Sequence, residues 1–170
     1  MRRAAQDRGY AMRRWGVGAA MVAVAIDQFS KAWAMGALWP PYSEGITRLP
    51  VLNLRLGFNT GVTFGMFADS AAGAVWLLVS IKLAVVAWLL MWLRRAANRT
   101  EATAIGLIIG GAIGNIADRL RIGAVTDFID AHYGGWHWPT FNMADAAIVI
   151  GVALLVLTGL RAPAAMARVG

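Results

Sequence analysis

The 170-residue sequence contains no cysteine. Disulfide bonds, thiolate nucleophiles and cysteine-bound metals are therefore excluded, although this absence indicates nothing about the cellular compartment. Acidic residues are also few, with nine Asp and Glu against 16 Lys and Arg, for a net charge of +7. In a soluble protein this charge would suggest nucleic-acid binding. Here the basic residues lie beside apolar runs, which favours a role in membrane orientation and predicts no nucleic-acid partner.

Apolar side chains are abundant, at 59% of the sequence, and they gather in four segments. The segments are about residues 15–35, 71–93, 102–120 and 141–160, close to the roughly 20 residues that cross a hydrocarbon core. Each predicts a helix, because lipid offers backbone groups no hydrogen-bond partners. We therefore expect an all-α integral membrane protein in which residues 1–170 form a single four-span domain.

The N-terminus has the charge pattern of a secretory signal. Arginines precede its first apolar run, and Ala23-Val24-Ala25 is similar to a cleavage site. The apolar character continues beyond that site, through Phe29 and Met35. We therefore favour an uncleaved first span.

The basic residues predict an orientation. They gather in the N-terminal tail, between the second and third spans (Arg94, Arg95, Arg99) and in the C-terminal tail (Arg161, Arg168). The two other connections, about residues 36–70 and 121–140, balance their charges, for example Arg48 with Glu44 and Arg55 with Asp69. The positive-inside rule then places both termini in the cytoplasm and these two connections outside the bacterial inner membrane.

The first outer loop contains a strand pattern. Apolar residues alternate with other residues from Leu52 to Phe58, a period of two that is typical of a strand. Pro40-Pro41 and Thr60-Gly61 mark turns on either side. We expect a small extracytoplasmic β-sheet cradle in this loop. In the second outer loop, aromatic residues suit the membrane interface: Tyr133, Trp136 and Trp138.

Two carboxylates are predicted to meet near the outer leaflet. Asp127 comes just after the third span and Asp145 lies one turn into the fourth. Because neighbouring carboxylates share a proton, such a pair can activate water and protonate a leaving amine without a metal or cofactor. Which Asp is the initial base stays open, because the pair titrates as a unit. The alternative is that each Asp caps a helix end.

Polar residues accompany this pair. Asn115, Asp118 and Arg119 share one face of the third span, and Asn142 lies three residues before Asp145. An asparagine amide both donates and accepts, so it can hold a peptide backbone or orient a carboxylate. The alternative for Asp118 and Arg119 is a structural ion pair with each other.

The remaining ionisable residues have simpler interpretations. Asp27 and Lys31 are four apart and predict a structural ion pair. No partner for Lys82, near the middle of the second span, can be identified. His132 and His137 follow Asp130, but their spacing fits no tight ligand pattern, so we predict no metal site.

Glycines recur along the third span at small-residue spacing: Gly106, Gly110, Gly111 and Gly114. This spacing predicts close helix packing, and the alternative is room for a substrate helix.

Four short motifs occur in order along nearly the whole chain. They are residues 27–31 (DQFSK), residues 59–65 (NTGVTFG), residues 110–119 (GGAIGNIADR) continuing to 125–128 (VTDF), and residues 141–145 (FNMAD). With these motifs the chain resembles the lipoprotein signal peptidases, or signal peptidase II. Val62, Thr63 and Thr126 depart slightly from the family pattern, which affects only fine substrate preference.

The resemblance implies four transmembrane helices, an outer half-sheet cradle and an aspartic endopeptidase. It implies a prolipoprotein substrate, cut before a cysteine that carries diacylglycerol, and sensitivity to the inhibitor globomycin. Asp127 and Asp145 match the catalytic aspartates. The other matched positions line the site or contact bound ligand: Asn59, Asn115, Asp118, Arg119 and Asn142.

Two other functions are compatible with four spans. One is a transporter or proton channel with a relay through Asp27, Lys82, Asp118 and Asp145. The other is a non-catalytic subunit whose aspartates bind a partner. Most of the carboxylates lie at the outer end of the predicted spans, which favours the peptidase.

Overall fold

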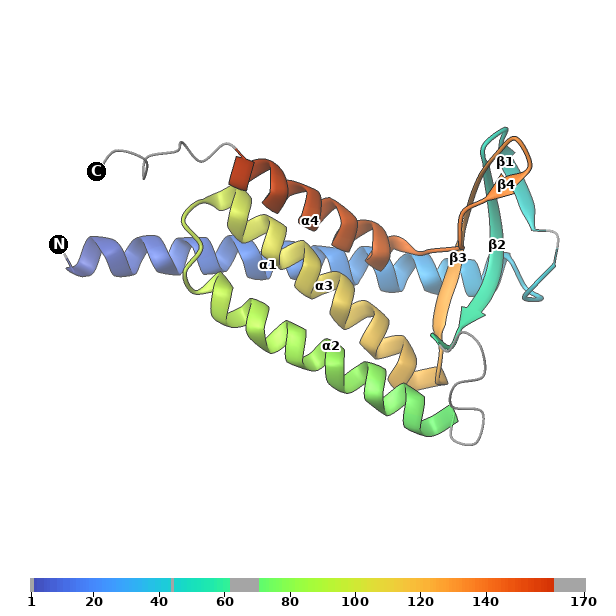
Figure 1. Ribbon diagram of the computed structural model, residues 1–170, viewed down its shortest axis with the longest axis horizontal. Coiled ribbons are helices and arrows are strands. Elements are labelled where there is room, and N and C mark those ends of the chain that lie inside the picture. Colours follow the sequence, from blue (N-terminus) through green and yellow to red (C-terminus); the bar gives the residue numbers. More distant parts are fainter. Residues whose placement is uncertain (1, 44, 62–70, 161–170) are drawn as a thin grey trace, which may run out of the picture.

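The computed structural model describes residues 2–43, 45–61 and 71–160, and it combines helices with a small sheet. The helices lie side by side along the long axis, and the sheet lies at one end of them (Figure 1). The first residue of α1 and the last of α4 lie at the opposite end. Several residues used above lie outside the described residues: Glu44, Val62, Thr63, Asp69, Arg161 and Arg168.

The helices follow the four apolar segments. They are α1 (Arg2–Ala37), α2 (Ala71–Leu93), α3 (Arg99–Ile122) and α4 (Met143–Leu160). The first is longer than expected, because the arginine-rich segment before residue 15 continues the same helix. By length and composition, Val75–Leu93 and Arg99–Ile122 could cross a membrane, and Met143–Gly159 is a shorter apolar helix.

The apolar side chains of α2 point in all directions. One side packs against α3 in a core that includes Val86, Leu89 and Ile105. Elsewhere on α2, large apolar side chains are exposed, including Trp76, Ile81, Leu83, Trp88 and Met91. A helix that is apolar all round is typical of a segment surrounded by lipid or protein.

Glycines let α3 approach α1 and α4 closely. A Cβ added to Gly106 would overlap the Gly16 carbonyl oxygen of α1. One added to Gly111 would overlap the Ala144 carbonyl oxygen in the first turn of α4. The predicted close packing is therefore correct. The alternative, that these glycines leave room for a substrate helix, is wrong at these positions, because α1 and α4 fill the space.

The four antiparallel strands are ordered β1-β2-β3-β4. They are β1 (Ile46–Leu49), β2 (Leu52–Asn59), β3 (Val125–Tyr133) and β4 (Trp136–His137). The strand predicted from the alternating pattern is β2. The sheet is not confined to the first loop, however, because β3 and β4 come from residues 121–140. Residues 125–128 of β3 are all buried, so this strand shows no alternation by which the sequence could reveal it.

The end of α3 leads directly into the sheet. Gly123 terminates the helix with φ 73°, and its N–H donates to the Arg119 carbonyl oxygen over 3.1 Å. Only glycine adopts this left-handed conformation without strain. Strand β3 then begins at Val125, so Asp127 lies within a strand. The sequence had suggested a position at the end of a helix.

Candidate active site

Asp127 is buried, with 2% of its surface exposed, and an amide meets each of its carboxylate oxygens. Asn59 Nδ2 donates to Oδ2 over 3.1 Å, and Asn142 Nδ2 donates to Oδ1 over 2.6 Å. Asn59 reaches this position because it ends β2 directly opposite Val125, two residues before Asp127. Pairing of the two strands therefore determines the first of these contacts.

Asn142 is placed by a short extension of the sheet. The N–H of Phe141 donates to the Ile129 carbonyl oxygen over 3.0 Å, and the N–H of Ile129 donates back over 2.9 Å. This bridge holds the residue before Asn142 against β3. As a result the Asn142 side chain lies completely buried beside Asp127.

Asp145 lies in the first turn of α4, where it exchanges hydrogen bonds with Asn142. The Asp145 N–H donates to Asn142 Oδ1 over 3.0 Å, and the Asn142 N–H donates to Asp145 Oδ2 over 3.3 Å. This reciprocal pattern is that of a capping box. The capping alternative is therefore correct for Asp145, but it occupies only one carboxylate oxygen. Oδ1 instead accepts a 2.8 Å hydrogen bond from Asn115 Nδ2.

Two amides connect the two carboxylates. The Asn142 Nδ2 that donates to Asp127 also donates to Asn115 Oδ1 over 3.2 Å, and Asn115 in turn donates to Asp145. An amide group has two donor hydrogens and one acceptor oxygen, so this chain uses both hydrogens of Asn142. The chain Asp127–Asn142–Asn115–Asp145 holds both carboxylates in one continuous hydrogen-bond network.

A buried ammonium group lies beneath this chain. Lys31 Nζ is 2.9 Å from Asp27 Oδ2, 3.0 Å from Asp118 Oδ2 and 3.1 Å from Asn115 Oδ1. Asp118 therefore pairs with Lys31. The suggested ion pair between Asp118 and Arg119 is wrong, because in the described structure Arg119 Nη1 donates instead to the Asn115 carbonyl oxygen.

The partners of Lys31 also hold backbone N–H groups. Asp27 Oδ1 accepts from Ala144 N over 2.9 Å, and Asp118 Oδ2 accepts from Thr126 N over 3.0 Å. Ala144 and Thr126 are the residues immediately before Asp145 and Asp127. The charged cluster of Asp27, Lys31 and Asp118 thus determines the backbone position of both aspartates.

Gln28 is a member of this cluster to which the sequence assigned no role. Its Nε2 donates to Asp27 Oδ2 over 3.1 Å and to Asp118 Oδ1 over 3.2 Å, while its Oε1 accepts from Arg121 over 2.8 Å. Its place between Asp27 and Lys31 in the first motif was the only signal.

Neither a hydrogen bond nor an ion pair joins Lys82 to another residue in the described part of the chain.

Arg119 is buried and has donor capacity to spare. Its Nη1 donates to the Asn115 carbonyl oxygen over 3.3 Å, and its Nε meets no partner within the described ranges. A Cβ built on Gly61 would lie 3.1 Å from Arg119 Nη2, so the guanidinium reaches the turn that follows β2. An unsatisfied buried donor is costly, which makes Arg119 a candidate for binding an external acceptor.

A pocket of about 340 Å³ opens onto Asp127. Its other walls come from the loop before β1 (Tyr42), from the end of β2 and the residue after it (Gly57, Phe58, Asn59, Thr60), and from the segment before α4 (Pro139, Thr140). The pocket gives a polypeptide segment access to the otherwise buried carboxylate from the sheet side.

Burial raises the pKa of Asp127 to about 6. The hydrogen bonds from Asn59 and Asn142 oppose this effect because they stabilise the ionised form, and the nearby charge of Asp145 raises the pKa further. A carboxyl group with such a pKa can hold a proton or release it near neutral pH.

His132 and His137 lie at a separate place in the sheet. His137 Nδ1 is 2.7 Å from Asp130 Oδ1, and the two imidazole rings stack with centroids 5.1 Å apart. Burial opposes ionisation of Asp130, but the hydrogen bonds from His137 and Asn53 outweigh it and lower its pKa. Among the described residues, no three metal-ligating side chains lie close enough together to hold a metal ion.

Comparison with known families identifies the chain. A profile described as "Signal peptidase (SPase) II" matches residues 19–161. The chain belongs to the signal peptidase II family. This membership confirms the resemblance inferred from the four motifs, and it makes the chain an aspartic peptidase. It also favours the peptidase over the transporter and partner-subunit alternatives.

Relatives and solved structures agree with this assignment. The lipoprotein signal peptidase of Methylorubrum extorquens is 43% identical over 148 residues, which cover 87% of this chain and 86% of that protein. That of Yersinia enterocolitica is 41% identical over 155 residues, covering 89% of both.

Two solved structures, each described as a bacterial membrane enzyme, have a similar fold. One has a TM-score of 0.74 at 25% identity, covering 91% of this chain and 93% of that one. The other has a TM-score of 0.76 at 28% identity, covering 86% and 93%. The predicted helical membrane enzyme with a small sheet is confirmed at this level. As a member of the signal peptidase II family with strongly apolar helices, the chain is a bacterial membrane protein.

Proposed function

We propose that this chain removes signal peptides from prolipoproteins, by hydrolysing the peptide bond before a cysteine that carries diacylglycerol. The observation that carries the proposal is the hydrogen-bonded chain Asp127–Asn142–Asn115–Asp145. Family membership and the names of the relatives support the substrate class.

Asp127 and Asp145 act together as general acid and general base. Before substrate binds, Asp127 can hold the proton that the leaving nitrogen needs, because burial raises its pKa to about 6. Asp145 takes a proton from water, and the water oxygen attacks the scissile carbonyl carbon. As the carbon–nitrogen bond breaks, Asp127 gives its proton to the leaving nitrogen. Exchange with solvent then returns the proton from Asp145 to Asp127.

Neighbouring polar groups position the reactants. Asn115 and Asn142 hold the carboxylates, and Asp118 holds the strand that carries Asp127. Arg119 Nε, which meets no partner among the described residues, can bind a carbonyl oxygen of the substrate. Asn59 lines the pocket beside Asp127 and contacts bound peptide there. This reaction uses protein side chains and water alone, so we propose no metal and no cofactor.

We also propose that α1 to α4 all cross the bacterial inner membrane, with both termini in the cytoplasm. The arginines at the far end of the helices support this orientation through the positive-inside rule. The sheet and the aspartate pair then lie near the outer leaflet. There they can meet a scissile bond whose neighbouring cysteine is anchored by its acyl chains. In this arrangement membrane lipid surrounds the four helices. We also expect globomycin to inhibit the enzyme.

The proposal is tested by cleavage of a diacylglyceryl-modified prolipoprotein by the purified protein in detergent, with a metal chelator present. We expect cleavage by the wild type and none by Asp145→Asn, with inhibition by globomycin. Asp130→Asn is a matched control. Asp130 is another buried aspartate of β3, but it contacts His137 and forms no hydrogen bond with Asp127 or Asp145. A folded wild-type protein that leaves the modified substrate intact would refute the proposal.

A further inference from the structure

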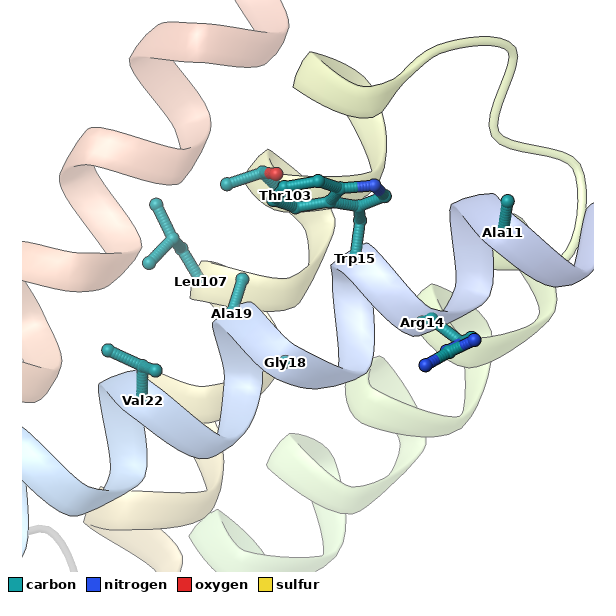
Figure 2. A pocket seen from close by; sticks show the side chains of 8 residues that line it. All are labelled: Ala11, Arg14, Trp15, Gly18, Ala19, Val22, Thr103 and Leu107. Carbon is teal, nitrogen blue, oxygen red and sulfur yellow. The ribbon is translucent and has the colours of Figure 1, made fainter.

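A groove runs between α1 and α3 in the half of the helix bundle farthest from the sheet. Its volume is about 700 Å³, and Figure 2 shows the eight side chains that line it. Six come from one face of α1, at helical spacing, and two from α3: Ala11, Arg14, Trp15, Gly18, Ala19, Val22, Thr103 and Leu107. The groove is separate from the pocket at Asp127, which lies at the sheet.

The floor of the groove is open and apolar. A Cβ built on Gly18 would meet no atom of another described residue within 4 Å, so none of the described residues fills the space above it. Val22 and Trp15 are both about half exposed, at 56% and 50%. Such a surface accommodates a hydrocarbon chain, because apolar walls need no polar partner from the ligand.

Two arginines give one end of the groove a positive charge. Arg14 belongs to the lining itself, and the Arg99 guanidinium lies 5.2 Å from the centre of the Trp15 ring. No carboxylate forms an ion pair with either arginine among the side chains that the structure describes. Guanidinium groups bind phosphate oxygens well, since their planar donors match the geometry of the anion.

We propose that this groove binds an anionic glycerophospholipid, with its phosphate at Arg14 and Arg99 and one acyl chain over Gly18. A basic pocket between membrane helices, next to apolar walls, suits a lipid that has a negative head group. A signal-peptide helix fits less well. Its own positively charged N-terminal region would meet the arginines at this end of the bundle. A zwitterionic lipid would leave the positive end of the groove without a net counter-charge.

The groove can be filled without disturbing its walls. Gly18→Leu places a side chain in the empty space, and leucine also favours a helix more than glycine does. Gly36→Leu is a matched control, because Gly36 lies on the same helix and an added Cβ there would also meet no atom of another described residue within 4 Å. Arg14→Gln with Arg99→Gln removes both charges and leaves the apolar floor intact.

The test is native mass spectrometry of the full-length protein, released from detergent that contains equal amounts of phosphatidylglycerol and phosphatidylcholine. We expect the wild type and Gly36→Leu to retain one phosphatidylglycerol, with a preference of about tenfold or more. Gly18→Leu should lose the bound lipid, and the double arginine variant should lose the preference. All variants should cleave substrate at the wild-type rate, because none alters the aspartate network.

Three results would overturn the proposal. The first is equal retention of the two lipids by the wild type. The second is unchanged phosphatidylglycerol binding in both Gly18→Leu and the double arginine variant. The third is a raised KM for prolipoprotein in Gly18→Leu with lipid retention unchanged, which would assign the groove to the signal-peptide helix. The readout is lipid binding, so its failure is distinct from failure of the proposed peptidase activity.

Discussion

Asp27 and Asp118 perform the same structural task from two different helices. Each accepts a hydrogen bond from the backbone N–H that precedes a candidate catalytic residue: Ala144 before Asp145, and Thr126 before Asp127. Lys31 lies between them, 2.9 Å from one carboxylate and 3.0 Å from the other. One ammonium group thus connects the supports of both candidate catalytic aspartates.

Replacing Lys31 should therefore damage both stability and activity. In Lys31→Met, two buried carboxylates lose their shared cation, and removal of one partner from a buried ion pair costs about 3–5 kcal/mol. Thermal unfolding in detergent should show a large fall in Tm. Adding Asp118→Asn to Lys31→Met removes the repulsion and should recover part of the Tm, but not the turnover. Equal effects of the single and double variants on Tm would contradict this coupling.

Asn142 should have two separable functions. It accepts the Asp145 N–H at the start of α4, and its amide connects Asp127 with Asn115. Asn142→Ala should lose both, with a cap contribution of about 1 kcal/mol. Asn142→Ser retains a capping oxygen but has no amide donor, so it should recover Tm while kcat stays about 10- to 100-fold below wild type. Wild-type kcat in Asn142→Ser would show that the amide bridge is dispensable.

The proposed catalytic pair is tested by isosteric replacement. Asp127→Asn and Asp145→Asn should each leave an inserted, folded protein whose kcat is reduced by about 10²-fold or more, because each loses a general acid or base. Folding is checked by Tm and by detergent gel filtration. Turnover above about a tenth of the wild-type value in either variant would count against the pair.

The pH dependence should report the proton on Asp127. Its pKa is raised to about 6, so the protonated form of Asp127 predominates below that pH. We expect kcat/KM to fall as pH rises through about 6, because Asp127 then loses the proton that the leaving nitrogen needs. Asn59 donates to the ionised carboxylate and lowers the pKa. Asn59→Ala should therefore raise the pKa and move this decrease to higher pH.

The matched control for the pH profile is Asn53→Ala. Asn53 donates to Asp130 Oδ2 over 3.3 Å, on the same pair of strands, and has no contact with Asp127. Its pH profile should coincide with that of the wild type. If the fall in kcat/KM stays at the same pH in Asn59→Ala, or moves equally in Asn53→Ala, then it does not report the proton on Asp127.

Much of the architecture could be predicted because it depends on local pattern. The apolar runs predicted α2, α3 and α4 to within a few residues, and the alternating residues of β2 predicted a strand. Spacing of three and four placed Asn115 and Asp118 on one buried face of α3. The partner of Asp118 could not be predicted, because the ion pair with Lys31 joins residues 87 positions apart in two helices.

The sequence by itself determined the membrane-type helices and the family, and it singled out the two aspartates as candidates, because hydropathy, charge pattern and short motifs are local properties of the chain. Only the tertiary structure decided that Asp127 lies in a strand, that β3 and β4 complete the sheet, and that one lysine supports both aspartates. These features depend on partners that are distant in sequence. Strand β3 pairs with β2 across more than 60 residues, and its buried faces leave no alternating pattern to reveal it. Hydrogen bonds between helices likewise form only because the glycines of α3 let α1 and α4 pack closely against α3.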